Sequence, residues 1–205
     1  MKKIAIDVVL LPPEEIMDLC IEVNEKAFKK GKGRHKLNKV NCVPHISLTM
    51  GCVYDDKLPC MIRDLGKISA ATEPLTLKIT GVEMYGPEGE RRGFLKINVP
   101  KKLRELHNEI HYRIARHVVN CDGPYVLVDG ESTGISDSSK EMLNKHSKTQ
   151  FGDDYNPHLT LCCYDSDKFC KDLKFPISFN VSKIALFQLG DGCTCKKLLN
   201  EFSLE

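Results

Sequence analysis

The sequence has no long apolar run, little net charge and no paired CxxC units. Without an uninterrupted apolar stretch of about 18 residues, it offers no candidate membrane span. The formal net charge is only +2, so a basic binding surface would have to be local. The apolar stretch after Met1-Lys2-Lys3 contains Asp7 and has no small-residue cleavage site behind it, which argues against a signal peptide. We therefore expect a cytoplasmic protein that makes no membrane contact.

Ten cysteines are many for a chain of 205 residues. Secreted disulfide scaffolds are usually shorter and space their cysteines more regularly. Structural zinc sites usually need two CxxC units, or one with paired histidines. His107 and His111 lie four apart on a predicted helix, but the glutamate between them stands one position late for the HExxH pattern. The sequence thus predicts free thiols in a reducing cytosol, no metal site and no cofactor.

Two short stretches of the chain resemble each other. They are PHISLT at 44–49 and PHLTL at 157–161. Because side chains alternate along a β-strand, we expect His45, Ser47 and Thr49 to share one face of a strand at about 43–50. His158 and Thr160 should likewise share a face of a second strand. Two such strands across a cleft would supply two imidazoles and two hydroxyls, enough for metal-free acid–base chemistry on a phosphate ester.

The predicted elements repeat in order along the two halves of the chain. Each half predicts a strand, a helix opened by proline, a histidine strand, a second helix and an alternating strand. The segments are 4–11, 12–31, 43–50, 55–65 and 74–85, then 94–99, 101–119, a strand from 157, 167–173 and 176–187, with a helix or strand at 196–203. We infer an internal duplication within a single domain, 1–205, whose halves of about 1–90 and 91–205 form two pseudo-symmetric lobes around a cleft.

The second half carries an insertion at about 120–156. Its glycines, aspartates and serines are typical of turns and loops, with a candidate strand at 125–128 and a helical turn at 140–145. Long segments of this kind often act as lids or binding loops. Whether this one covers the cleft is left open by the sequence.

One H-x-[ST] motif in each half of a duplicated chain resembles the two-histidine (2H) phosphoesterase superfamily. The pattern is most similar to the family that contains 2′-5′ RNA ligase and the RNA 2′,3′-cyclic phosphodiesterases. The resemblance implies an α+β, bilobal fold of duplicated β-α-β units, with two antiparallel sheets flanking a central cleft and helices outside. It also implies that His45 and His158 are catalytic and that Ser47 and Thr160 bind the substrate phosphate. Ser47 stands where threonine is commoner in the family, but it keeps the hydroxyl. The first strand lacks the Arg-x-Phe start that is typical of the bacterial cyclic phosphodiesterases, so the resemblance leaves the exact substrate open.

The expected function is that of a metal-independent phosphodiesterase. Histidines near their ordinary pKa can supply both the base and the acid close to neutral pH. The substrate would be an RNA end, an oligonucleotide or a small cyclic nucleotide, with a 2′,3′-cyclic phosphate hydrolysed to a 2′-phosphomonoester by a monomer. Two alternatives remain: cleavage of 2′-5′ linked or cyclic oligonucleotides (or 2′-5′ RNA end joining), and an inactive nucleotide- or RNA-binding module.

Further substrate contacts are suggested by a basic stretch and by tyrosines. Residues 29–39 (KKGKGRHKLNK) carry six cations and no acid, so Arg34 and Lys36 are candidates for holding an RNA backbone. Aromatic rings can stack on bases. The tyrosines considered for this role are Tyr54, Tyr85, Tyr125 and Tyr155. Tyr155 is the first candidate because it lies three residues before His158.

Overall fold

The computed structural model describes residues 1–87, 90–122 and 136–205. The strands are β1 (Lys3–Leu10), β2 (Ile46–Tyr54), β3 (Leu75–Tyr85), β4 (Arg92–Ile97), β5 (His158–Tyr164), β6 (Ile177–Val181), β7 (Lys183–Leu189) and β8 (Cys195–Ser203). The helices are α1 (Glu14–Phe28), α2 (Leu58–Ser69), α3 (Lys101–Ala115), α4 (Asp137–Thr149) and α5 (Ser166–Phe169), with 3-10 turns at Asp55–Lys57, Gly152–Asp154 and Asp191–Cys193.

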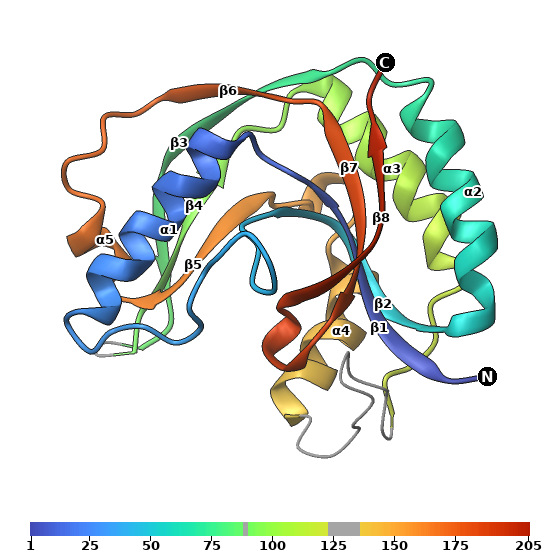
Figure 1. Ribbon diagram of the computed structural model, residues 1–205, viewed down its shortest axis with the longest axis horizontal. Helices are drawn as coiled ribbons and strands as arrows, with labels where there is room; N and C mark the ends of the chain where they lie inside the picture. Colours follow the sequence, from blue (N-terminus) through green and yellow to red (C-terminus); the bar gives the residue numbers. More distant parts are fainter. Residues whose placement is uncertain (88–89, 123–135) are drawn as a thin grey trace.

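Two four-stranded antiparallel sheets form the centre of the molecule (Figure 1). One has the strand order β2-β1-β7-β8 and the other β5-β4-β3-β6. Helix α1 packs against β5, whereas α2 packs against β7 and β8 and α3 packs against β2, so helices cover the outer faces of both sheets. The predicted α+β architecture of two antiparallel sheets with outer helices is confirmed.

The composition of the sheets differs from the predicted division into halves. β7 and β8 join β1 and β2 in one sheet, while β3 joins β4, β5 and β6 in the other. Each lobe therefore takes strands from both 1–90 and 91–205, because β1 pairs with β7 and β3 pairs with β4. Sequence order does not give sheet order, since an antiparallel strand can pair with any available edge. The duplication itself stays a prediction.

Most predicted segments lie near their expected positions, but some differ in division or extent. The alternating run at 176–187 is two strands, β6 and β7, which belong to different sheets and are separated by Ser182. Helix α3 ends at Ala115 rather than at 119, and the last segment, predicted as a helix or a strand, is the strand β8. The helical turn expected at 140–145 is the 13-residue helix α4. The candidate strand at 125–128 and part of the turn at 86–89 lie outside the described residues.

The residues at the start of α1 explain why the helix begins there. Pro13 precedes the first helical residue with an extended backbone, and Glu14 and Glu15 occupy the first turn. Proline cannot donate a backbone hydrogen bond, and acids favour the positive end of the helix dipole. Ile16 and Val23 then lie buried at helical spacing on the face that meets the sheet.

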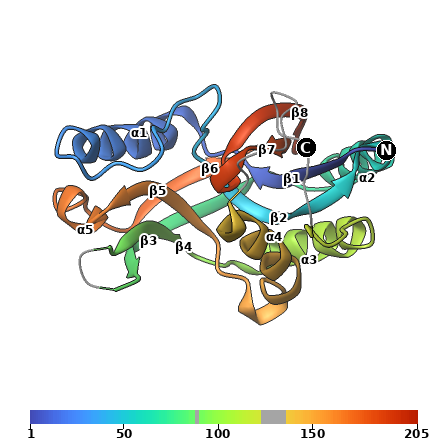
Figure 2. The same cartoon turned by 90° about the horizontal axis from the view of Figure 1, so that it is seen from below.

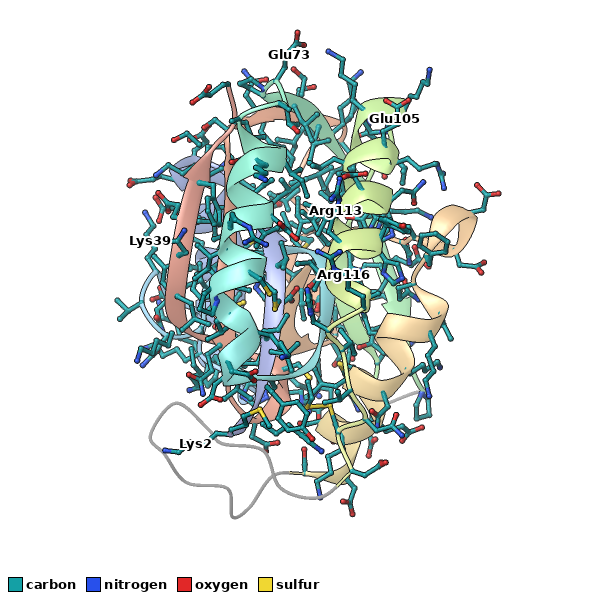
Figure 3. All side chains as sticks on the ribbon, turned by 90° about the vertical axis from the view of Figure 1, so that its right-hand side faces the viewer. Lys2, Lys39, Glu73, Glu105, Arg113 and Arg116 are labelled. Atoms are coloured by element: carbon teal, nitrogen blue, oxygen red, sulfur yellow. A yellow bond between two sulfur atoms is a disulfide. The ribbon has the colours of Figure 1, made fainter. Side chains whose placement is uncertain are left out.

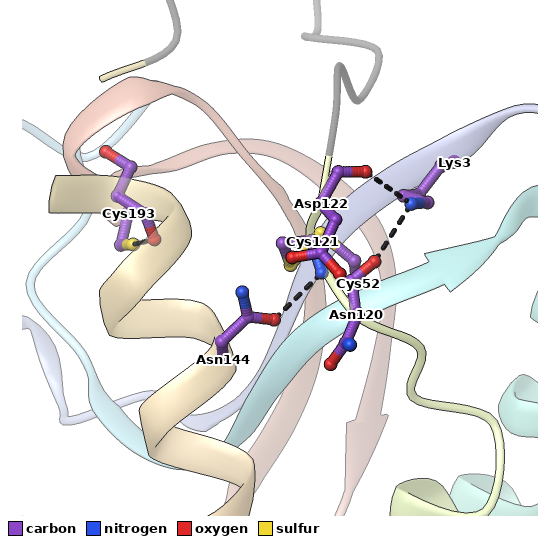
Figure 4. The surroundings of a disulfide bond; sticks show 8 residues. Lys3, Cys52, Asn120, Cys121, Asp122, Asn144 and Cys193 are labelled. Carbon is purple, nitrogen blue, oxygen red and sulfur yellow. Dashed lines mark hydrogen bonds between the residues drawn. A yellow bond between two sulfur atoms is a disulfide. The ribbon is translucent and has the colours of Figure 1, made fainter. Parts of the chain in front are cut away.

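A disulfide joins Cys52 in β2 to Cys121, which follows α3 (Figure 4). The prediction that all cysteines are free is wrong for these two, while the other eight are free. The two cysteines are 69 residues apart, so no local spacing pattern marks them as a pair. They meet because the chain after α3 forms a bridge from Val119 back to Cys52.

Hydrogen bonds reinforce this attachment of the insertion. Lys3 Nζ donates to the carbonyl oxygens of Asn120 at 2.9 Å and Asp122 at 3.0 Å. The backbone N–H of Cys121 donates to Asn144 Oδ1 of α4 at 2.8 Å (Figure 4). The first residues of the predicted insertion are therefore tied to β1, β2 and α4.

No helix in the described ranges combines the length and hydrophobicity that a membrane span needs.

Removing the disulfide should lower the free energy of unfolding. Because it closes a loop of 69 residues, chain entropy predicts a loss of about 4 kcal/mol in the Cys52→Ala/Cys121→Ala double variant. Urea unfolding under non-reducing conditions measures this, with Cys60→Ala as a free-cysteine control. Thiol labelling in denaturant should count eight reactive cysteines before reduction and ten after it, and ten before reduction would contradict the pairing.

Candidate active site

A cavity of about 560 Å³ lies between the two sheets. Its wall contains His45 and Ser47 from the first motif and His158 and Thr160 from the second. A second hollow, of about 650 Å³, lies on the outer side between α2 and α3, where Figure 3 shows charged side chains such as Arg113. That hollow includes none of the motif residues, so the candidate site is the cavity between the sheets.

The two histidines are held in the same way. His45 stands directly before β2, and its Nδ1 lies 2.7 Å from the carbonyl oxygen of Val43. His158 begins β5, and its Nδ1 lies 2.8 Å from the carbonyl oxygen of Asn156. A carbonyl oxygen can only accept a hydrogen bond, so each Nδ1 carries the hydrogen. Each Nε2 is then left as the basic nitrogen of a neutral ring.

Burial changes the charge state of both rings. Desolvation lowers the pKa of His45, and a positive charge on His158 lowers it further, against the opposing bond to Val43. Desolvation also lowers the pKa of His158, against the opposing effects of the Asn156 carbonyl and Glu83. His158 is close enough to His45 to lower its pKa, and both rings are predominantly neutral at pH 7.

A bulge in β2 changes the face that Thr49 occupies. Val8 of β1 pairs with Thr49, but Val9 pairs with Ser47, so Leu48 is an extra residue in the ladder. Ser47 lines the cavity, whereas Thr49 lies fully buried with its Oγ1 3.5 Å from His111 Nδ1 of α3. The expectation that Thr49 shares the face of His45 and Ser47 is wrong, because strict alternation fails at a bulge.

Asp7 is a site residue that motif analysis missed. It lies in β1, is fully buried, and its Oδ2 accepts a hydrogen bond of 2.7 Å from Ser47 Oγ. The same oxygen is 3.6 Å from His45 Nε2. Desolvation raises the pKa of Asp7, with the bond from Ser47 acting in the opposite direction. The available signal was an acid in the middle of an otherwise apolar strand, IAIDVVLL.

Tyr155 supports the first motif. Only 4% of its surface is exposed, and its hydroxyl donates to the carbonyl oxygen of Ser47 at 3.1 Å. Its ring stacks on His107 of α3, with centroids 3.7 Å apart and planes 6° apart. Tyr155 lines the cavity, but its low exposure and its stacking on His107 weigh against a role as a stacking platform for a base, and its contact with substrate stays a prediction.

The other predicted contacts divide into two groups. Arg34 and Tyr85 line the cavity. Lys36 and Tyr54 do not belong to its wall: Lys36 is exposed on the loop, and Tyr54 ends β2, far along the strand from Ser47. Tyr125 lies outside the described residues.

The basic stretch at 29–39 is anchored to β5. Asn24 of α1, which is fully buried, donates to the carbonyl oxygens of His35 and Leu161 and accepts from the N–H of Leu37. Lys32 and Lys39 also pair with acids, at 3.2 Å from Asp165 and 2.8 Å from Asp18. These contacts hold the basic stretch against α1 and β5, and RNA binding by Arg34 and Lys36 stays a prediction.

The insertion contributes directly to the cavity. Helix α4 packs against β2 and lies near the centre of Figure 2. Its Met142, Lys145 and His146 line the cavity wall. Burial lowers the pKa of His146 to about 3, with a further lowering by His158. Sequence spacing gave no role to His146, because the fold of the insertion was needed to place it.

The cavity therefore brings together the two histidine motifs that carry the resemblance to the two-histidine phosphoesterases. The sequence signature of the 2′-5′ RNA ligase superfamily matches residues 22–192, so the chain belongs to that superfamily. The predicted resemblance is confirmed at this level. The catalytic roles of the individual residues stay predictions.

Solved structures share the fold. TT0787 of Thermus thermophilus superposes with a TM-score of 0.63 at 16% identity, covering 98% of this chain and 97% of that one. E. coli LigT complexed with 3′-AMP gives 0.55 at 16% identity, and LigT complexed with NADP+ gives 0.57 at 16%, each covering 100% of this chain and 99% of that one. Among curated protein sequences, none matches this chain significantly.

Lowering the pH should destabilise the fold through His107. This ring is fully buried, donates from Nδ1 to the Leu48 carbonyl at 2.8 Å, and has its pKa lowered by desolvation to about 4. Between pH 6.5 and about pH 4, the His107 imidazole is protonated in the unfolded chain but neutral in the folded chain. The free energy of unfolding should therefore fall by up to about 3 kcal/mol from pH 6.5 to pH 4 and stay unaffected by this residue above pH 6.5.

Denaturant unfolding at several pH values tests this, with His107→Gln expected to flatten the slope. His117→Gln changes a more exposed histidine and should alter the slope much less. Equal slopes in wild type and His107→Gln would contradict the assignment.

Proposed function

We propose that this protein is a metal-independent phosphodiesterase that hydrolyses 2′,3′-cyclic phosphates at RNA ends or in small nucleotides. The observation that carries the proposal is the matched pair of histidines. His45 and His158 line one cavity, each with Nδ1 bound to a backbone carbonyl and a hydroxyl residue two positions further on. Such a pair supplies two basic nitrogens for one phosphate.

The reaction needs one proton removed and one supplied. One histidine takes a proton from water through Nε2 while the water oxygen forms a bond to phosphorus. The other histidine enters the step as an imidazolium, protonated on Nε2 as well as Nδ1, because the charge of the bound phosphate raises its pKa. As the bond from phosphorus to the 3′ oxygen breaks, this histidine donates its Nε2 proton to that oxygen, and a 2′-phosphomonoester remains. Each proton transfer contributes about 10²- to 10⁴-fold to the rate.

The hydroxyls of Ser47 and Thr160 stabilise charge on the non-bridging phosphate oxygens. Ser47 Oγ donates to Asp7 in the structure, so it has to turn from the carboxyl to the phosphate when substrate binds. Thr160 extends from β5 on the opposite side of the cavity. The two hydroxyls would thus hold the phosphate from both sheets.

Cavity size and the related structures support a nucleotide substrate. A volume of about 560 Å³ is within the usual range for small-ligand sites. LigT, which shares the fold, has been crystallised with 3′-AMP, NADP+ and ATP. We accordingly infer a terminal or free nucleotide as the ligand, bound by a monomer in the cytoplasm.

Loss of either motif histidine should abolish hydrolysis. His45→Ala and His158→Ala are each expected to lower kcat on a 2′,3′-cyclic nucleotide by at least about 10²-fold, because either the base or the acid is lost. His117→Ala, a histidine outside the cavity, is the matched control and should retain activity. Wild-type rates in either motif variant would exclude the mechanism.

A substrate panel separates the alternatives. Comparing a 2′,3′-cyclic nucleotide with 2′-5′ linked and cyclic oligonucleotides, and reading the product phosphate position by NMR, identifies the reaction. Nucleotide binding without any product would favour the inactive binding module.

Removing the Thr160 hydroxyl should slow the chemical step. Thr160→Val keeps the shape of the side chain but loses one donor to the phosphate, so kcat should fall by about 10²-fold with a smaller change in KM. Thr160→Ser keeps a hydroxyl and should retain most of the activity. An unchanged kcat in Thr160→Val would remove this residue from the proposed site.

A further inference from the structure

Three side chains with metal-binding atoms converge at the inner end of His45. Asp7, His45 and Cys195 each offer one donor atom, and these atoms lie within 4.8 Å of one another. They come from β1, from the residue before β2 and from the first position of β8, which belong to a single sheet. Strands of one rigid sheet therefore hold the three donors together.

The Asp7 carboxyl group is only partly satisfied within the described residues. Its Oδ2 accepts from Ser47, but the buried Oδ1 has no hydrogen-bond partner there. Asp7 and Cys195 are both fully buried, and both side chains are acids. The neighbouring nitrogen is His45 Nε2, 3.6 Å from Asp7 Oδ2, on a ring that is predominantly neutral. Buried polar atoms normally have hydrogen-bond or metal partners. A cation bound beside Asp7 would give its carboxyl group the partner that the described side chains do not provide.

The donor set suits zinc. Thiolate, imidazole and carboxylate are the usual ligands of Zn²⁺, which binds them at about 2.0 to 2.3 Å in tetrahedral sites. Ligands at those distances are separated by about 3.5 Å. The 3.6 Å between Asp7 Oδ2 and His45 Nε2 already matches this separation. Cys195 Sγ lies within 4.8 Å of both of these atoms and would be the third ligand.

The tautomer of His45 also suits zinc. Its Nδ1–H donates to the Val43 carbonyl, which leaves the Nε2 lone pair on the side of Asp7. Zinc-bound histidines typically donate their second ring nitrogen to a carbonyl or carboxylate in this way. His45 and Cys195 both line the cavity, so an ion and a fourth ligand can approach from it.

We propose that Asp7, His45 and Cys195 bind Zn²⁺, and that zinc bound there switches off the two-histidine site. The inhibition rests on the proposed function, because zinc would occupy the Nε2 lone pair that His45 needs for proton transfer. Zinc binding itself does not depend on that function. Removal of the ion restores the neutral imidazole and with it the acid–base pair.

Direct metal binding is the first test. Titrating the purified full chain with Co²⁺, a spectroscopic substitute for Zn²⁺, should produce a thiolate-to-cobalt charge-transfer band that added Zn²⁺ abolishes. Cys195→Ser should lose the band, and its zinc affinity in calorimetry should fall at least about 100-fold. Asp7→Asn keeps the size of the side chain and should weaken zinc binding while retaining the band.

Cys193→Ser is the matched control. Cys193 is also a free, buried cysteine that lines the cavity, but its Sγ contacts the Ser139 carbonyl at 3.8 Å and lies outside the three-donor group. This variant should keep both the band and the zinc affinity. A band that survives in Cys195→Ser, or that disappears in Cys193→Ser instead, would overturn the assignment.

Hydrolysis of a 2′,3′-cyclic nucleotide is the second test. Zn²⁺ should inhibit the wild type, a chelator should restore the rate, and Cys195→Ser should need at least about 100-fold more Zn²⁺ for the same fractional inhibition. Zinc binding at Cys195 without inhibition would overturn the switch. A chain that binds zinc but hydrolyses nothing after chelation would refute the proposed function and leave the metal site standing.

Discussion

Pairing between strands from opposite ends of the chain holds both walls of the cavity in place. β1 pairs with β2 on one side and with β7 on the other, so the first histidine strand is fixed to the C-terminal part of the molecule. β4 pairs with both β3 and β5 and fixes the second histidine strand in the same way. The chain crosses from β6 in one sheet to β7 in the other with only Ser182 between them, which limits how far the two sheets can move apart at that point.

The cavity concentrates polar groups that are difficult to bury. His45, His158 and His146 all have their pKa lowered by desolvation, and Asp7 has its pKa raised for the same reason. Uncharged imidazoles cost less to bury than imidazoliums, so the fold tolerates several of them near one another. The same neutrality leaves nitrogen lone pairs available, either to take a proton or to bind a metal ion.

The two sides of the cavity are unequal. On the β2 side, α4 and the Cys52–Cys121 disulfide attach the insertion, and His146 comes with it. On the β5 side, Asn24 anchors the basic stretch and brings Arg34 to the wall. Two histidines held in the same way thus lie in unequal surroundings, and these surroundings would determine which substrates fit the proposed site.

The sequence by itself determined the elements and the two motifs. Pro13 and the acids after it set the start of α1, and the alternation of apolar residues set β3. The repeated His-x-hydroxyl pattern identified His45, Ser47, His158 and Thr160. These signals can be recognised in the sequence because they depend only on neighbours within a few residues. Only the tertiary structure decided the sheet order, the bulge that turns Thr49 away, the burial of Tyr155 and the disulfide. It also brought Asp7 to Cys195 from opposite ends of the chain. Those outcomes depend on strand pairing and register between distant segments, which local spacing does not specify.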